Sequence, residues 1–174
     1  MAAFTWEDCI EAASLEGLEN RVFVLPENEL GQLFFCIKDM GVNLQAVSLR
    51  NGEVICCQKK DVVGLLKPEL LPDSEKLQLS QIRPVGAAEL PEQGVEYFGY
   101  SFLPDGKYAA GVWLRGPEEV WSYARMQKDY QYRVLICDRD DFAVLEFVKG
   151  MLVFPDQQDL QKFLQKSEGG IQMG

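Results

Sequence analysis

Three pairs of short apolar segments, each joined by a turn sequence, constrain the fold of this chain most strongly. The pairs are 42–49 with 53–58, 95–103 with 107–115, and 132–137 with 142–148. Asn51-Gly52 lies in the first connection, and this dipeptide is the strongest short-range hairpin signal. Proline followed by glycine at Pro104-Asp105-Gly106 suits a type I turn with a bulge. Because hairpins join antiparallel strands, the sequence predicts an antiparallel sheet rather than repeated β-α-β units.

Helical patterns and further short strands separate these hairpins. Apolar residues at helical spacing (Leu30, Leu33, Phe34, Ile37 and Met40) predict a helix after Pro26. Further helices are expected over 5–17, 61–66, 117–129 and 156–164, and further strands over 21–25, 77–82 and 151–154. The predicted class is therefore α+β, mainly antiparallel sheet built from hairpins with helices packed on it. The expected order is α-β-α-ββ-α-loop-ββ-α-βββ-α.

One internal boundary is indicated by composition. Residues 84–94 are rich in proline, glycine and alanine, which is typical of a linker or a long surface loop. We expect an N-terminal α+β half over 1–83, a C-terminal ββα-ββα half over 95–168 and a flexible tail over 169–174. One continuous domain remains an alternative.

Charge and residue usage limit the functions that this chain can have. The net charge is −10 and no histidine is present, which disfavours nucleic-acid binding and excludes histidine-dependent catalysis. The first residues lack the basic segment of a signal peptide, and no apolar run approaches the ~20 residues of a membrane helix. We therefore expect a cytoplasmic protein without membrane or nucleic-acid partners.

The five cysteines do not predict a disulfide framework, because their number is odd and no CxxC spacing occurs. Cys9, Cys36 and Cys137 lie in apolar segments and are expected to be buried. Neighbouring side chains alternate across a strand, so one of Cys56 and Cys57 should be buried and the other less so. A redox role for this pair stays open.

No catalytic or cofactor motif is present, so no catalytic residue, metal or cofactor is predicted. The sharpest acidic group is Asp138, Asp140 and Asp141, followed by Glu146 and Lys149. Carboxylates at such spacing can hold Mg²⁺, but a polar tip between two apolar strands is also what a hairpin turn needs. The spacing from the acids to the lysine does not match that of metal-dependent nucleases, so the sequence favours a hairpin turn over a metal site.

Aromatic residues are concentrated in one region. All six tyrosines lie between residues 97 and 132, together with Trp113 and Trp121. If Leu103 pairs with Lys107, the register places Tyr97 opposite Trp113 and Gly99 opposite Gly111. The facing glycines form a strip of small residues, over which a helix of this chain, a partner or a ligand can approach the sheet closely. The predicted binding residues are Tyr97, Gly99, Gly111, Trp113 and Trp121.

Acidic residues are concentrated near the N-terminus, where residues 1–31 hold seven acids and one base. Glu7, Asp8 and Glu11 form either a solvated face or a docking face for a basic partner. These features together predict a non-catalytic, acidic protein-interaction module of the adaptor, chaperone-like or inhibitor type. A small-molecule-binding regulatory domain is the alternative, followed by a carboxylate- or cysteine-dependent enzyme. The oligomeric state is left open.

Overall fold

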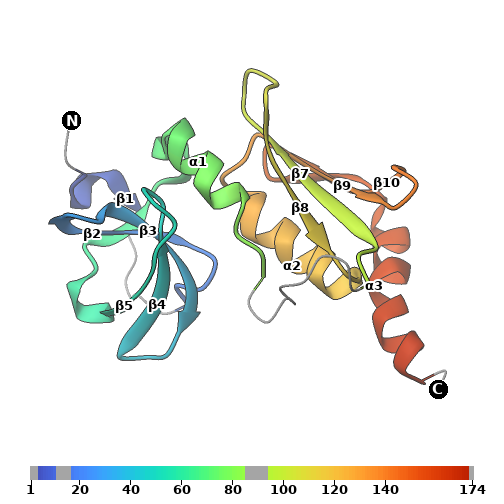
Figure 1. Ribbon diagram of the computed structural model, residues 1–174, viewed down its shortest axis with the longest axis horizontal. Coiled ribbons are helices and arrows are strands. Elements are labelled where there is room, and N and C mark those ends of the chain that lie inside the picture. The colour runs from blue at the N-terminus through green and yellow to red at the C-terminus, as the bar shows by residue number, and fades with distance from the viewer. Residues whose placement is uncertain (1–3, 11–16, 85–93, 173–174) are drawn as a thin grey trace. The chain divides into compact units, whose positions relative to one another are not determined.

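The computed structural model describes residues 4–10, 17–84 and 94–172 and divides the chain into two compact units, Met1–Leu79 and Ser80–Gly174 (Figure 1). The predicted α+β class with antiparallel sheets is confirmed, since each unit contains one antiparallel sheet. The expected linker over 84–94 lies mostly outside the described residues. The predicted domain bounds and the flexibility of the tail therefore stay predictions.

Unit 1 is built around a six-stranded sheet in the order β1-β6-β2-β3-β4-β5. Its strands are β1 (Cys9–Ile10), β2 (Val22–Asn28), β3 (Gly31–Asp39), β4 (Asn43–Ser48), β5 (Val54–Gln58) and β6 (Gly64–Leu66). Single turns of 3-10 helix, η1 (Trp6–Asp8), η2 (Lys59–Asp61) and η3 (Pro68–Leu70), precede β1, β6 and the helix α1 (Asp73–Ser80). Stacked Phe23 and Phe34, with ring centroids 5.8 Å apart, lie in its core.

The predicted helix over 26–40 is wrong, because this segment forms the end of β2, a turn and β3. Residues 33–36 are all buried, so β3 is covered on both faces. A strand of that kind carries a continuous apolar run, and such a run satisfies the helical template by coincidence. The turn is closed by the Asn28 side chain, which accepts the Leu30 N–H at 2.8 Å, and by Gly31 at φ +92°.

Three shorter predictions in unit 1 are also wrong. The expected helix over 5–17 is the single turn η1 followed by β1, and residues 11–16 lie outside the described part. The expected helix over 61–66 contains strand β6, and the expected strand over 77–82 overlaps helix α1. The strand over 21–25 and the hairpin around Asn51-Gly52 are confirmed by β2, β4 and β5.

Asp39 at the end of β3 anchors the β3–β4 turn. Its carboxylate lies 2.9 Å from the Lys59 ammonium and accepts the Gly41 N–H at 2.9 Å. The hydrogen bond from Lys59, followed by that from Gly41, lowers the pKa of Asp39. A carboxyl group with a lowered folded-state pKa stabilises the fold above its unfolded-state pKa of about 4, and this contribution is lost as the pH falls.

We therefore expect Asp39→Asn to lower the free energy of unfolding at neutral pH by about 1.5–3 kcal/mol, the range for hydrogen bonds to a charged group. Below about pH 3 the difference between wild type and variant should shrink, because the unfolded chain, whose carboxyl pKa is about 4, binds a proton there more readily than folded Asp39 does. Urea unfolding at both pH values measures this. An equal difference at both would contradict the assigned role.

The predicted burial of Cys9, Cys36 and Cys137 is confirmed; Cys56 and Cys57 differ in exposure as expected, but Cys57 is only half-buried, and Cys56 is exposed on the edge strand β5. Burial raises the pKa of Cys36 to about 12 and also raises that of Cys57.

Since the thiolate is the reactive form, Cys56 should be the one fast-reacting thiol of the folded protein. Cys56→Ser should remove the fast phase of a thiol-reagent titration. Loss of that phase in Cys57→Ser instead would be inconsistent with this burial pattern.

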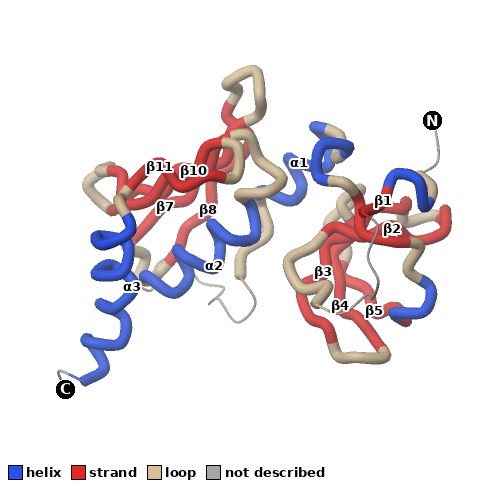
Figure 2. The backbone as a smooth tube through the Cα atoms, turned by 180° about the vertical axis from the view of Figure 1, so that it is seen from behind, coloured by secondary structure: helices blue, strands red, loops and turns tan. Residues whose placement is uncertain are grey.

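Unit 2 contains a five-stranded sheet in the order β11-β10-β9-β7-β8. Its strands are β7 (Tyr97–Phe102), β8 (Tyr108–Leu114), β9 (Arg133–Asp138), β10 (Ala143–Val148) and β11 (Met151–Phe154), and its helices are α2 (Pro117–Gln127) and α3 (Gln157–Gln172). Every one of these elements was predicted. Both helices lie on the same side of the sheet (Figures 1 and 2), where Tyr123, Ile136 and Leu145 belong to the core.

The predicted register between β7 and β8 is wrong by one residue. Leu103 does pair with Lys107, since its N–H donates to the Lys107 carbonyl at 2.9 Å. A bulge then intervenes: Phe102 lies opposite Tyr108, but Ser101 lies opposite Ala110. Tyr97 is consequently opposite Leu114 rather than Trp113, and Gly99 is opposite Val112 rather than Gly111. An extra residue in one strand changes, for every later residue of that strand, which residues of the partner strand share its face of the sheet.

Candidate functional site

The helix-covered face of the unit 2 sheet holds three of the five predicted binding residues. Tyr97 meets Phe163 of α3 edge-to-face at 5.8 Å between ring centroids, and Trp121 of α2 lies 6.2 Å from Phe147. Gly99 is buried, and a Cβ built on it would lie 2.8 Å from Cε2 of Tyr123. The close approach that the glycine permits is therefore used by α2 of the same chain.

Gly111 and Trp113, the other two predicted residues, lie on the opposite face. We call this the open face, because no described helix of unit 2 covers it. The register of the five strands arranges its residues in three rows across the sheet. The rows are Met151, Val148, Arg133 and Phe102; Phe154, Glu146, Leu135, Tyr100 and Gly111; and Ala143, Cys137, Phe98 and Trp113.

The open face is apolar although water reaches part of it. Phe98 is 38% exposed, Phe154 45% and Met151 71%. Antiparallel sheets that face water on one side normally carry polar side chains there. Exposed large apolar side chains at two places on one sheet face, on β7 and on β11, are a departure from that pattern.

Charges on the open face cancel one another. Arg133 and Glu146 are its only charged residues in the three rows, and they form an ion pair. The Arg133 guanidinium also lies over the ring of Phe102, 5.0 Å from its centroid. The pairing leaves no unpaired ion among the residues of the three rows, and an unpaired ion is costly to bury.

Trp113 is held in place at the β8 edge of the open face. Arg83 lies over its ring at 3.5 Å from the centroid, and the Arg83 Nε–H donates to the Trp113 carbonyl at 2.9 Å. The same guanidinium lies 2.9 Å from the Glu119 carboxylate. Tryptophan and arginine are both among the residue types enriched at positions that dominate binding energy.

The acidic tip of the β9–β10 hairpin borders the row that contains Phe98. The Asp138 carboxylate accepts the N–H groups of Asp140 at 2.9 Å and Phe142 at 3.0 Å, so it closes the turn. Among the residues that the structure describes, no group of three acidic or cysteine side chains is arranged to hold a metal ion. Asp140 and Asp141 are exposed at this tip. Glu96 lies near the tip, because the next residue, Tyr97, pairs with Asp138.

The predicted N-terminal docking residues are only partly described. Glu7 is exposed, and Asp8 accepts the Thr5 N–H at 2.9 Å and so closes η1. Glu11 lies outside the described residues. A docking role for this segment stays a prediction.

Comparison with protein-family models, with curated proteins and with solved structures finds no match for this chain. None of the helices in the described ranges has the length and apolar character that a membrane crossing requires.

Proposed function

We propose that this chain is a non-catalytic protein-interaction module that binds a protein partner through the open face of the unit 2 sheet. The observation that carries the proposal is the apolar, locally neutral character of that face beside exposed Phe98, Phe154 and Met151. Gly111 and Trp113 keep the binding role predicted for them. Phe98, Tyr100 and Leu135 join them on the surface.

An amphipathic helix of the partner is the occupant that fits this face best. The backbone groups inside the sheet are already paired with neighbouring strands, so an occupant must satisfy its own backbone hydrogen bonds, as a helix does. Five strands span about 19 Å and the three rows span about 13 Å along the strands. One helix of about 13 residues, about 10 Å wide, covers such an area.

The partner is expected to be basic near one end of this helix. At the β9–β10 tip the carboxylates of Asp138, Asp140 and Asp141 outnumber the one cation, Arg139, so a lysine or arginine near Ala143 and Cys137 would meet net negative charge. The net charge of −10 would also accelerate encounter with a basic protein and disfavour nucleic acid. The affinity itself would come from the apolar contacts.

Affinity capture with matched charge variants tests this function. Phe98→Lys places a charge in the open face, whereas Val42→Lys makes the same charge change at a residue of unit 1 that is 76% exposed. We expect wild type and Val42→Lys to enrich the same protein from the native cell extract, and Phe98→Lys to lose it by at least about tenfold, the effect of ~1.4 kcal/mol. Equal enrichment by all three, or enrichment only of this chain itself, would refute the proposal.

A further inference from the structure

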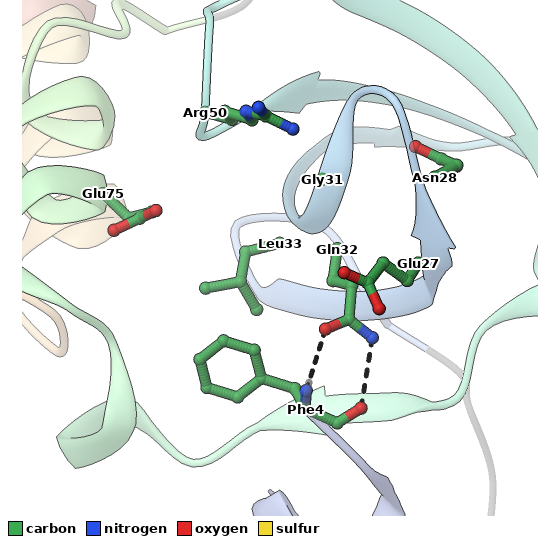
Figure 3. A pocket seen from close by; sticks show the side chains of 8 residues that line it. All are labelled: Phe4, Glu27, Asn28, Gly31, Gln32, Leu33, Arg50 and Glu75. Carbon is green, nitrogen blue, oxygen red and sulfur yellow. Dashed lines mark hydrogen bonds between the residues drawn. The ribbon is translucent and has the colours of Figure 1, made fainter. Parts of the chain in front are cut away.

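Residues of unit 1 alone line a cavity of about 280 Å³ (Figure 3). Four segments of unit 1 line it: the β2–β3 hairpin, Arg50 from the β4–β5 turn, Phe4 before η1 and Glu75 from α1. Its volume lies at the lower end of the range for small-molecule sites. Apolar and charged side chains meet there, as is usual in ligand pockets.

Arg50 supplies a positioned cation at this cavity. Its Nη1 donates to the Glu29 carbonyl at 3.1 Å. Its aliphatic stem lies against Gly31, where a built Cβ would be 3.4 Å from Arg50 Cδ. These contacts restrict the guanidinium, whose planar set of N–H groups is suited to binding a carboxylate.

Two carboxylates lie on opposite sides of the same cavity, Glu27 on β2 and Glu75 on α1 (Figure 3). Within the described ranges, neither of them forms an ion pair with Arg50 or with any other cation. The cavity therefore combines one cationic and two anionic groups that do not neutralise each other directly. A ligand that carries both charges would complement them.

The apolar part of the cavity is formed by Phe4 and Leu33. The Gln32 carboxamide fixes Phe4, since it accepts the Phe4 N–H at 2.8 Å and donates to the Phe4 carbonyl at 3.1 Å. This pair of hydrogen bonds positions the Phe4 ring beside Leu33 (Figure 3). An apolar group of a ligand can be buried against the two side chains.

We infer that this cavity binds a small zwitterion of the α-amino acid type with an apolar side chain. The ligand carboxylate pairs with Arg50, its ammonium group pairs with Glu75 or Glu27, and its side chain contacts Phe4 and Leu33. This binding site is independent of the proposed protein interaction.

Calorimetry with three related probes tests the inference: leucine, isopentylamine, which lacks the carboxylate, and 4-methylpentanoate, which lacks the ammonium group. We expect leucine to bind at least about tenfold more tightly than either fragment, because each fragment loses one charge-assisted contact. Arg50→Gln should weaken leucine binding by about 10–100-fold and leave isopentylamine binding unchanged. The double variant Glu27→Gln/Glu75→Gln, which removes both candidate partners of the ammonium group, should weaken leucine binding but not 4-methylpentanoate binding.

The control is Arg139→Gln, which removes an exposed cation of unit 2 and should leave all three affinities unchanged. Comparing two probes on one variant separates a lost contact from a folding defect, which would weaken both. Absence of leucine, methionine and phenylalanine binding at millimolar concentration would overturn the inference. So would an Arg50→Gln variant that weakens leucine and isopentylamine equally.

Discussion

Gly99→Ala is expected to lower the free energy of unfolding of unit 2 by about 1–3 kcal/mol, the usual effect of overpacking a filled core. The added methyl group would lie 2.8 Å from Cε2 of Tyr123 and 3.3 Å from Cδ1 of Leu114. Tyr123 is fully buried, and its hydroxyl donates to the Ser80 carbonyl at 2.7 Å and lies 3.1 Å from Ser101 Oγ. The ring cannot retreat without weakening these contacts. Urea or thermal unfolding measures the change.

Gly116→Ala is the matched control for this substitution. A Cβ at Gly116 meets no atom within 4 Å, and its φ of −152° is extended backbone that alanine adopts. Because Gly116 is the N-cap of α2, we expect a loss of at most about 1 kcal/mol. Equal losses in Gly99→Ala and Gly116→Ala would show that Tyr123 does not lie as tightly on β7 as described.

Trp113→Ala is expected to weaken mainly partner binding, and Trp121→Ala is expected to lower mainly the stability of the fold. Trp113 lies on the open face, so its truncation should weaken partner binding by about 30-fold or more, the ~2 kcal/mol typical of a dominant interface residue. Loss of its contact with Arg83 should cost about 1 kcal/mol of stability. Affinity for the captured partner, measured by calorimetry, gives the first quantity and urea unfolding the second.

Trp121 on α2 packs against Phe147 of the helix-covered sheet face, so Trp121→Ala should lower the free energy of unfolding. We expect a loss of about 2–4 kcal/mol, somewhat below that of a fully buried tryptophan, with little change in the partner affinity of the folded fraction. If Trp121→Ala weakened binding while leaving stability unchanged, the helix-covered face would be the functional one. That result would contradict the assignment of the open face.

Turn chemistry made the fold of unit 2 predictable. Its elements end at residues typical of turns, and strands and helices lie between them. These turn residues are Pro104, Pro117, the Asp138–Asp141 tip and Gly150. In unit 1 the apolar pattern was misleading, because β3 is buried on both faces and mimics a helix. Whether a short apolar run is a strand or a helix depends on what packs against it, which one sequence does not contain.

The candidate site could be predicted only in part. The bulge between Ser101 and Phe102 exchanges the faces of β7 relative to β8, and no residue pattern announces it. A signal for the open face was nevertheless present in β9, where Val134, Leu135, Ile136 and Cys137 are consecutive apolar residues. Such a run indicates a strand with two apolar faces, whereas the helices of unit 2 cover only one.

Site-specific photo-crosslinking in the native cell tests whether the open face is where a partner protein binds. A photoreactive phenylalanine analogue is placed at Phe98, at Phe154 or, as the control, at Val42, all of which are at least 38% exposed. Our expectation is that Phe98 and Phe154 give an adduct with the same partner protein and that Val42 gives none with it. Adducts of equal yield at all three positions, or adducts from the open face only to nucleic acid or to a second copy of this chain, would contradict it.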